Sequence, residues 1–386
     1  MVNYVFLSVY FYSVPNLRFN NDPYKKYNLY EFATRVTRKN KDNVSNLPLT
    51  ISAQYGLVDQ VSFFNKTVAS KDMSGYYLLK NGEFAYNKSY SNDYPWGAIK
   101  RLDLYDMGCL STLYICFKTN DNIVNSNYLV HYFESSKWHK QVADIAGEGA
   151  RNHGLLNIGV NDFFNTKHAV PTIENQIKIA GFLDLIEKRI QTQIKIIDDY
   201  NSLKMGIYNC MFKENYADYK LKQLAYIVKG DQINNDQLLS NGSYYMMNGG
   251  ASPSGYLDSY NVSENTISIS EGGNSCGYVQ FNSSPFWSGG HCYTIQNVNS
   301  ALIENKYLYH YLKYKEKEIM NLRIGTGLPN IQKKDLENFT ILVPSLLIQR
   351  KNLALFEMLD EKISILNEEL ANLQKQKKYL LCNMFI

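Results

Sequence analysis

Residues 171–212, PTIENQIKIAGFLDLIEKRIQTQIKIIDDYNSLKMGIYNCMF, and residues 344–385, PSLLIQRKNLALFEMLDEKISILNEELANLQKQKKYLLCNMF, are two versions of one segment. They align without a gap at an offset of 173 residues. The identical positions are Pro171/Pro344, Gln176/Gln349, Lys178/Lys351, Ile190/Ile363, Lys204/Lys377, Met211/Met384 and Phe212/Phe385. A chain that ends each half with the same long segment is built as two modules on two spacers. This layout constrains its function more than any catalytic motif does.

Both copies have the apolar spacing of a long helix. Steps of four and three residues make a heptad seam, and a leading Pro suits a helix start. The seam positions are Ile179, Leu183, Ile186, Ile190, Ile197, Tyr200, Ile207 and Met211, interrupted by Gln193 and Lys204, and then Phe356, Leu359, Ile363, Leu366, Leu370, Leu373, Leu380 and Met384. One such helix could not bury its stripe alone, so we expect the two to pair as an antiparallel coiled coil. Separate packing on separate domains is the alternative.

Length and composition indicate a globular protein with more than one domain. The 386 residues suffice for two or three ordinary domains. The chain is 45% hydrophobic and 20% charged, and 32 Tyr dominate its aromatic content. The net charge of +4 is mildly basic, which permits a nucleic-acid partner without requiring one.

Cysteine spacing gives no sign of a metal site or a disulfide framework. The six cysteines are scattered without a CxxC pair, which is typical of free cytosolic thiols. A zinc site made of Cys276, His291 and Cys292 would lack the usual ligand spacing.

The N-terminal stretch 1–15, MVNYVFLSVYFYSVP, is apolar and aromatic. It has no basic residue before Arg18, lacks a small-residue cleavage site and is too short to span a bilayer. It therefore predicts a strand or packing segment in a cytoplasmic protein. An extension upstream of the natural start, covering residues 1–13, fits the same pattern.

The repetition extends beyond the helices. The offset between the halves falls from 192 to 179 to 173 along the pairs Tyr27–Ala33/Tyr219–Ala225, Tyr128–Phe133/Tyr307–Leu312 and Gly154–Ile158/Gly327–Ile331. The order of these landmarks is unchanged, so the first module carries about 19 extra residues in its middle. We therefore divide the chain into a first module, a first spacer, a second module and a second spacer, at 1–170, 171–212, 213–343 and 344–386.

Between the landmarks the sequence indicates strands and turns. Residues 265–270 alternate apolar and polar side chains, which predicts a strand. Glycine-rich turns are expected at 248–255, 271–277 and 288–292. In the first module, residues 82–90 occupy the place of the second module's Ser-Glu-Gly-Gly turn. Each module is thus a mixed α/β globule.

At this point the residues match a known family. The second module contains NGGASPSGY (248–256), ENTISISEGGNSCGYV (264–279), FWSGGHCY (286–293) and GTGLPNIQKKDL (325–336). Together with the near-duplicate helices, this strongly resembles the specificity (S) subunit of type I restriction-modification systems, from about residue 14 to the end. The resemblance implies an α/β fold with two target recognition domains, separated by two long antiparallel coiled-coil helices in a pseudo-twofold internal repeat.

The resemblance also implies how such a protein works. Each recognition domain would bind one half of a split DNA sequence, and two unlike modules imply an asymmetric bipartite target. The helices would fix the gap between the half-sites and dock the methyltransferase subunits.

DNA recognition needs polar side chains that reach base edges and cations that hold phosphates. In the second module the candidates are Asn248, Ser252, Ser254, Tyr256, Asn274, Ser275, Tyr278 and His291, with Lys229, Arg323, Lys333 and Lys334 for phosphates. In the first module they are Gln54, Tyr55, Asn87, Ser89, Tyr90, Trp96, Asn152 and His153, with Lys88, Arg101 and Arg151 as charges. For any one of them, a solvated turn residue is the alternative.

Motifs for chemistry are incomplete. Asp22-Pro23-Tyr24 lacks the second proline of a DNA methyltransferase motif. Gly272 and Gly277 have P-loop spacing, but Tyr278 stands where the required Lys would be. His131 and His310 occupy equivalent positions in an aromatic helix and are expected to be packing residues. The sequence therefore favours a chain that binds DNA while others catalyse.

The expected partners are double-stranded DNA, two methyltransferase (M) subunits and restriction (R) subunits, with no membrane. This chain should bind no cofactor or metal, while S-adenosylmethionine would serve the methyltransferase and ATP with Mg the restriction partner. Two alternatives remain open. A stand-alone nuclease with tandem recognition domains would need a carboxylate–Lys cluster that we do not find, and a tandem DNA-binding regulator would need no partners.

Overall fold

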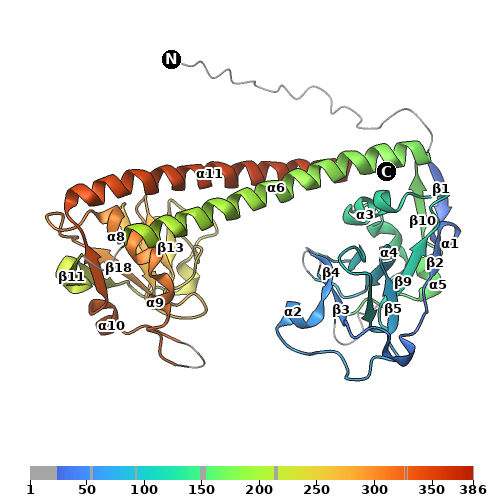
Figure 1. The fold of residues 1–386 in the computed structure, drawn as a ribbon, viewed down its shortest axis with the longest axis horizontal. Coiled ribbons are helices and arrows are strands. Elements are labelled where there is room, and N and C mark those ends of the chain that lie inside the picture. The colour runs from blue at the N-terminus through green and yellow to red at the C-terminus, as the bar shows by residue number, and fades with distance from the viewer. Residues whose placement is uncertain are drawn as a thin grey trace, which may run out of the picture. The chain divides into compact units, whose positions relative to one another are not determined.

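A computed structural model describes residues 24–52, 55–91, 94–147, 154–212, 216–325, 327 and 329–385, with Asn235 described by its backbone only (Figure 1). The chain forms two compact units. Unit 1 comprises Met1–Thr192 and Leu370–Ile386, and unit 2 comprises Gln193–Glu369. The apolar stretch 1–15 lies outside the described residues, so its role stays a prediction.

Unit 1 is a mixed α/β globule that leads into a long helix. Its elements are β1 (Lys25–Asn28), α1 (Leu29–Phe32), β2 (Ala33–Arg35), the 3-10 turn η1 (Lys41–Asn43), β3 (Leu49–Ser52), β4 (Gly56–Asp59), α2 (Gln60–Phe64), β5 (Tyr77–Lys80), β6 (Phe84–Asn87), β7 (Ala98–Arg101), β8 (Met107–Leu110), β9 (Ile115–Thr119), α3 (Ser126–Glu134), α4 (His139–Ile145), α5 (Val160–Phe164), β10 (Lys167–Val170) and the start of α6 (Ile173–Met211).

Unit 2 repeats this plan with different loops. Its elements are the end of α6, β11 (Ala217–Lys220), α7 (Leu221–Leu224), β12 (Tyr226–Lys229), the 3-10 turn η2 (Asn235–Gln237), β13 (Tyr244–Met247), β14 (Gly255–Leu257), β15 (Thr266–Ser270), β16 (Val279–Asn282), β17 (Trp287–Ser288), β18 (Cys292–Gln296), α8 (Asn305–Tyr314), α9 (Glu316–Met320), α10 (Lys333–Glu337), β19 (Thr340–Val343) and most of α11 (Leu346–Asn383).

The main sheets of the two units have the same topology. The four-stranded sheet of unit 1 has the order β2-β9-β6-β7, and that of unit 2 has the order β12-β18-β15-β16. All neighbours in both sheets are antiparallel. Helix α3 packs on β7 and α8 packs on β16. The internal repeat predicted from landmarks is therefore confirmed as a repeat of fold.

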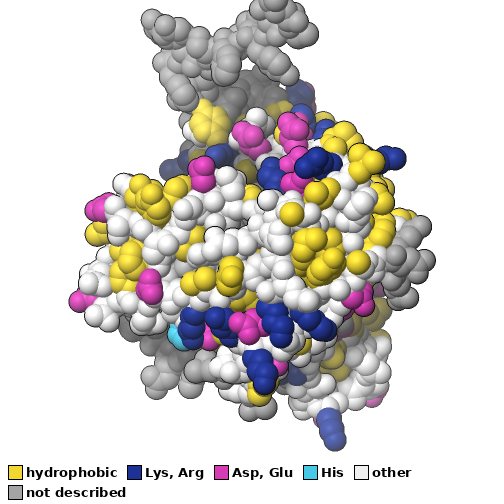
Figure 2. Space-filling model, turned by 90° about the vertical axis from the view of Figure 1, so that its left-hand side faces the viewer, with side chains coloured by type: hydrophobic (Ala, Val, Ile, Leu, Met, Phe, Trp, Pro, Cys, Tyr) yellow, Lys and Arg dark blue, Asp and Glu magenta, His cyan; other side chains and the backbone are white. Residues whose placement is uncertain are grey.

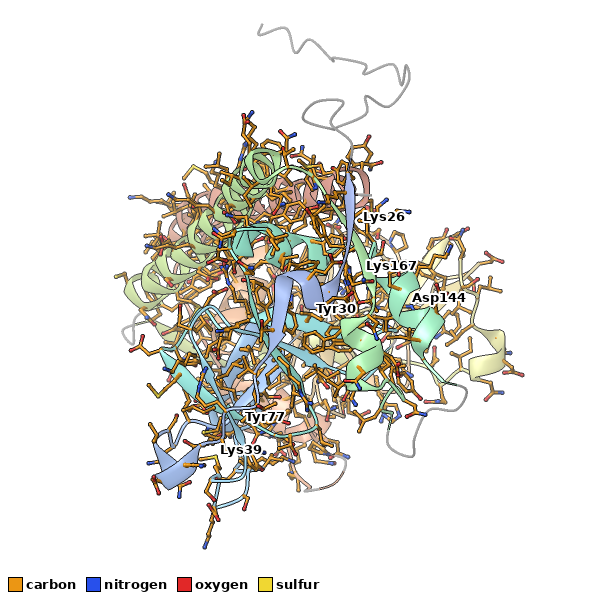
Figure 3. The ribbon with its side chains drawn as sticks, turned by 90° about the vertical axis from the view of Figure 1, so that its right-hand side faces the viewer. Lys26, Tyr30, Lys39, Tyr77, Asp144 and Lys167 are labelled. Carbon is orange, nitrogen blue, oxygen red and sulfur yellow. The ribbon has the colours of Figure 1, made fainter. Side chains whose placement is uncertain are left out.

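A second matched pair of strands closes each unit. β1 pairs antiparallel with β10, and β11 pairs antiparallel with β19. Figure 3 shows Lys26 and Lys167 on the two adjacent strands of unit 1. Because β10 and β19 directly precede the long helices, this pairing anchors the start of each helix to its own globule.

The units differ in the rest of their strands. Unit 1 adds the two-stranded sheets β3-β4 and β5-β8, whereas unit 2 adds the three-stranded sheet β14-β13-β17. In unit 1 the Lys39 ammonium lies 4.4 Å above the Tyr77 ring on β5 (Figure 3), a cation–π contact. The two units therefore share the topology of their main sheet but differ in their smaller sheets.

The heptad seams are confirmed by burial. Every predicted seam residue of both helices is buried or half-buried, and none is exposed. Within each unit the helices run antiparallel, because Glu187 meets Lys377 in unit 1 and Lys204 meets Asp360 in unit 2. The polar interruptions of the seam therefore have partners on the opposite helix. Gln193 likewise donates to the Leu366 carbonyl oxygen over 2.9 Å.

The Lys377 ammonium holds two carboxylates of unit 1. Its Nζ lies 2.8 Å from Glu134 and 2.7 Å from Glu187. Burial alone would raise the pKa of Glu134, but the charges of Lys100 and Lys377 outweigh burial and lower that pKa to about 2. The Lys204–Asp360 pair occupies the equivalent place in unit 2, as the offset of 173 requires.

An identical glutamine fastens each long helix to its module. Gln176 donates to the carbonyl oxygens of Pro171 and Ile123 and accepts from the Asn125 N–H over 2.7 Å. In unit 2, Gln349 donates to Pro344 and Leu302 and accepts from the Glu304 N–H over 2.8 Å. Both glutamines are fully buried. Each one satisfies the N-cap backbone of α3 or α8, which explains why a polar residue is kept there in both copies.

The C-terminal end of each long helix contributes an aromatic ring to the core of the module from which the helix does not start. Phe212, at the end of α6, packs edge-on against Tyr307 and Tyr311 of α8 in unit 2. Phe385, just after α11, packs against the equivalent tyrosines Tyr128 and Tyr132 of α3 in unit 1. Each core therefore includes an aromatic ring supplied by the helix that starts from the other module.

This packing predicts the effect of removing either ring. Phe212→Ala and Phe385→Ala should each lower the free energy of unfolding by about 3–5 kcal/mol, because each leaves a cavity in a core. Amide hydrogen exchange should place the loss in unit 2 for Phe212→Ala and in unit 1 for Phe385→Ala. The matched control is Leu185→Ala on α6, where the side chain is 67% exposed. Equal stability of Phe385→Ala and Leu185→Ala in urea would contradict the packing.

Candidate nucleic-acid interface

Strand β15 positions the most concentrated group of candidate residues. The alternation at 265–270 correctly predicts this strand, but all five residues of β15 are buried rather than one face alone. The polar face is buried because its hydroxyls are bonded within the protein. Ser268 Oγ accepts from Asn282, and Ser270 Oγ donates to the Gly249 carbonyl oxygen over 2.7 Å. Ser270 thereby ties the 248–255 loop to the end of β15.

Three glycine-rich loops meet where β15 ends. The Glu271 N–H donates to the His291 carbonyl oxygen over 2.9 Å. The His291 N–H donates to Asn248 Oδ1 over 3.0 Å. These bonds connect the 271–277 loop, the 289–291 loop and the 248–255 loop, each of which the sequence predicts as a turn. His291 is held through its backbone on both sides, which fixes the point at which its side chain leaves the loop.

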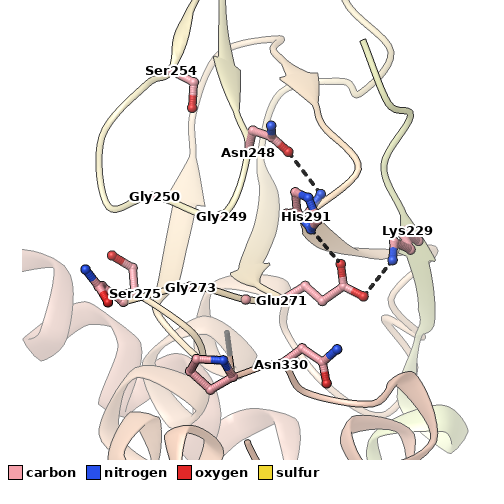
Figure 4. Close-up of a pocket in the computed structure, with 13 residues that line it drawn as sticks. Lys229, Asn248, Gly249, Gly250, Ser254, Glu271, Gly273, Ser275, His291 and Asn330 are labelled. Atoms are coloured by element: carbon pink, nitrogen blue, oxygen red, sulfur yellow. Dashed lines mark hydrogen bonds and ion pairs between the residues drawn. The ribbon is translucent and has the colours of Figure 1, made fainter. Parts of the chain in front are cut away.

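The three loops, together with the 329–330 segment, line an open cavity of about 590 Å³ (Figure 4). Six predicted DNA contacts come together here, namely Lys229, Asn248, Ser254, Asn274, Ser275 and His291. The remaining lining is formed by Gly249, Gly250, Glu271, Gly272, Gly273, Pro329 and Asn330. Amide, hydroxyl, imidazole, ammonium and carboxylate groups thus face one hollow, which suits hydrogen-bonded recognition of a polar ligand.

Glu271 is a buried charged residue of this cavity and is 7% exposed. One carboxylate oxygen, Oε1, accepts from the Lys229 ammonium over 2.6 Å and from the Tyr293 hydroxyl over 3.1 Å. The other oxygen, Oε2, is buried without a hydrogen-bond partner in the described part of the chain. Its nearest ionisable neighbour is His291 Nδ1 at 3.5 Å. Lys229 therefore neutralises the carboxylate, and the acceptor Oε2 is left unsatisfied.

The other candidates of the second module lie outside this lining. Ser252 and Tyr256 are exposed on and after the 248–255 loop. The Tyr278 ring is covered by the Lys313 ammonium at 4.1 Å. Arg323 is exposed, and Lys333 and Lys334 are exposed on α10. The face of unit 2 in Figure 2 carries a row of Lys and Arg side chains interrupted by acidic ones, which suits contact with phosphates.

Unit 1 holds an equivalent loop on the same backbone frame. The Lys88 carbonyl oxygen accepts from the Leu156 N–H over 2.9 Å, and the Tyr90 N–H donates to Gly154 over 3.1 Å. In unit 2 the Glu271 carbonyl oxygen accepts from Ile331 over 2.9 Å, and the Gly273 N–H donates to Pro329 over 3.1 Å. The same two bonds follow β6 and β15, so a lysine in unit 1 takes the place of the glutamate in unit 2.

The first-module candidates do not gather as the second-module ones do. Tyr55, Ser89 and Tyr90 are exposed on loops, and Asn87 accepts from the Ser89 N–H. Trp96 packs against the core of unit 1. Arg101 is bound internally, by Asp103 over 2.6 Å and by Asn127 over 2.7 Å. Gln54, Arg151, Asn152 and His153 lie outside the described residues.

Glu271 and Asn330 also line the cavity, although the sequence did not single them out as DNA contacts. Glu271 appeared there only as part of a glycine-rich turn. The signal that could have identified it is a single acidic residue between a buried strand and two glycines. Its contacts with Lys229 and His291 are far apart in sequence and do not follow from local pattern.

His131 and His310 have the buried environment of packing residues, and the cysteines are free thiols. His131 and His310 are buried in α3 and α8, and burial lowers the pKa of His310 to about 3. All six cysteines are free. Burial raises the pKa of Cys292 to about 11, which disfavours a thiolate next to His291. Within the described ranges, no cluster of three or more His, Cys, Asp or Glu side chains is arranged to hold a metal ion.

Comparison with known proteins shows which family the chain resembles. Residues 213–375 match the model of the type I restriction modification DNA specificity domain. A putative type I specificity subunit of Mycoplasma pneumoniae is 34% identical over 155 residues, covering 40% of this chain and 41% of that protein. These matches support the resemblance of the chain to the specificity subunits of type I restriction-modification systems. A second such subunit, from Mycoplasma genitalium, is 32% identical over 127 residues, or 33% of each chain. The chain therefore aligns with less than half the length of these relatives.

The fold of a specificity subunit extends over the whole chain. The crystal structure of the type I restriction-modification S subunit from M. genitalium superposes with a TM-score of 0.61 at 18% identity, covering 97% of this chain and 99% of that one. This similarity confirms the predicted fold class, with two sheet-containing modules and long paired helices. No helix among the described residues combines the length and apolarity needed to cross a bilayer.

Two glycines of the cavity loop give a prediction about the stability of this chain. Gly273 and Gly277 both have positive φ, at 75° and 90°. A Cβ on Gly277 would lie 2.8 Å from the Met320 Cα, whereas one on Gly273 would meet no atom within 4 Å. We expect Gly273→Ala to cost about 1–2 kcal/mol from backbone strain alone. Gly277→Ala should cost about 1–3 kcal/mol more because of the clash.

Urea unfolding of the two variants measures this difference, with the wild-type chain in parallel. Equal midpoints for Gly273→Ala and Gly277→Ala would show that the packing of the loop against α9 is not as described.

Proposed function

We propose that this chain is the DNA-recognition subunit of a type I restriction-modification complex, in which each module binds one half of an asymmetric bipartite target. The observation that carries the proposal is the shared frame of the two units. The same sheet order and the same two backbone bonds present Lys88 in unit 1 and Glu271 in unit 2. Different side chains on one frame suit the recognition of two different base sequences.

The proposed contacts follow from the cavity and its surroundings. In the second module, Asn248, Ser254, Asn274, Ser275 and His291 would contact base edges, while Lys229, Arg323, Lys333 and Lys334 would attract phosphates. In the first module the exposed loop residues Tyr55, Ser89 and Tyr90 are the strongest candidates for base contacts. Lys88 would supply a cation at the place that Glu271 takes in unit 2.

The long helices would set the gap between half-sites and dock two methyltransferase subunits. Large apolar side chains lie exposed on both helices away from the seam, including Leu185, Leu203, Leu347 and Met358. Exposed apolar residues on a helix that is already paired are suited to a further protein partner. We also propose that the first module, the first spacer and the second module end at residues 170, 212 and 343.

Catalysis would belong to the partners in the cytoplasm. The methyltransferase subunits would use S-adenosylmethionine to methylate one adenine in each half-site, which they would reach by base flipping. Restriction subunits would use ATP and Mg. The present chain would select the DNA and bind no cofactor itself.

Single-molecule methylation sequencing tests the proposal directly. Cells carrying the complete system should show one asymmetric bipartite motif with methylated adenine in both halves. Deleting this chain should abolish the motif, and restoring it on a plasmid should bring back the same motif. The methyltransferase subunits stay present in the deletion strain as the control. Methylation that persists unchanged without this chain, or a purified chain that methylates or cuts DNA alone, would refute the proposal.

The spacer function makes a separate prediction. Seven residues added to both helices, next to Gln193 and next to Leu366, preserve the heptad register and lengthen each helix by about 10.5 Å. The gap between the half-sites should then grow by up to about three base pairs, while both half-site sequences stay the same. The matched control replaces seven exposed residues without changing length. An unchanged gap in the methylated motif would show that helix length does not set it.

A further inference from the structure

The unsatisfied Oε2 of Glu271 points to a specific role for His291. Oε2 is buried without a hydrogen-bond partner in the described part of the chain. A buried acceptor without a donor is destabilising, so a nearby N–H is strongly preferred. His291 Nδ1, at 3.5 Å, needs only a small shift to donate to it (Figure 4).

The hydrogen bonding around Glu271 favours one tautomer of a neutral His291. Lys229 already neutralises Glu271 through Oε1 at 2.6 Å. What Oε2 lacks is therefore a donated hydrogen bond rather than a further charge. The neutral imidazole with its proton on Nδ1 satisfies Oε2 and adds no charge. Its other nitrogen, Nε2, then carries a lone pair and no proton.

The His291 ring is placed to use that lone pair. Its side chain is 62% exposed, although its backbone is fixed by Asn248 and Glu271. The two nitrogens of an imidazole point in divergent directions, so Nε2 faces away from the carboxylate. An exposed acceptor on a fixed loop requires a donor from its ligand.

We propose that Glu271 positions His291 as a hydrogen-bond acceptor, and that His291 Nε2 selects a base with an exocyclic amino group in the major groove. Only adenine N6 and cytosine N4 offer such a donor there. This inference rests on the proposed function, since it names the chemical class that one position of the second half-site must have. Glu271 acts through His291 and is therefore a positioning residue.

Glu271→Gln tests the positioning directly. The side-chain oxygen of Gln should stay with Lys229 and Tyr293, since both donate to Oε1. The amide NH₂ then faces Nδ1 and donates to it, which moves the histidine proton to Nε2. One position of one half-site should lose its requirement for an amino group and admit guanine or thymine, whose O6 and O4 accept hydrogen bonds. A purely structural role for Glu271 would not alter this requirement.

Methylation sequencing of the complete system reads the outcome, with Glu264→Gln as the matched control. Glu264 is exposed and lies outside the cavity lining. Glu264→Gln should leave the motif unchanged, and His291→Ala should relax the same single position that Glu271→Gln alters. An unchanged base at every position in Glu271→Gln would overturn the proposal. So would relaxation of different positions by the two cavity variants.

A measurement on the wild-type complex guards against misfolded variants. Once the motif is known, duplexes can carry purine for adenine, or 2-pyrimidinone for cytosine, at each position in turn. Loss of the amino group at one position of one half-site should weaken binding roughly 10- to 100-fold. Binding that is indifferent to every such replacement in that half-site would overturn the proposal. A wild-type chain with no motif of its own would instead refute the proposed function, before any variant is made.

Discussion

The exchange of helix ends is the constraint on which the rest of the structure depends. Each long helix starts beside its own module, where a buried glutamine fixes it, and ends with a phenylalanine in the core of the other unit. A core that lacked this ring would hold a cavity of about one aromatic side chain. Neither core is therefore complete with one contiguous stretch of chain.

This constraint explains why the helices stay similar while the modules diverge. The seam, the glutamines and the phenylalanines each have fixed partners, so their chemistry is restricted in both copies. The loops after β6 and β15 are held by backbone hydrogen bonds, which do not depend on the side chain. Lys88 and Glu271 can therefore occupy equivalent places without disturbing the fold. The proposed function needs this separation, because a DNA-recognition subunit would have to change its target while keeping its partners.

The cavity of unit 2 shows how such a loop can carry selectivity. Glu271 is buried with one oxygen paired and one unsatisfied, and His291 stands between it and solvent. On the proposed DNA-binding surface a carboxylate would repel phosphate, but Lys229 cancels its charge. What remains is a directional group rather than a net charge, and direction is what distinguishes one base from another.

The sequence alone determined the features that depend on local period and repetition. The offset of 173 located both helices, the steps of four and three identified the buried seam, and the alternation at 265–270 identified β15. These predictions succeeded because helix and strand periods are local properties of the backbone. The remaining features depend on tertiary structure. The fold buries the polar face of β15 and holds Arg101 in hydrogen bonds within the protein. It also brings Lys229, Asn248, Glu271 and His291 together around one cavity. Such contacts join residues distant in the chain, so only the folded protein defines them.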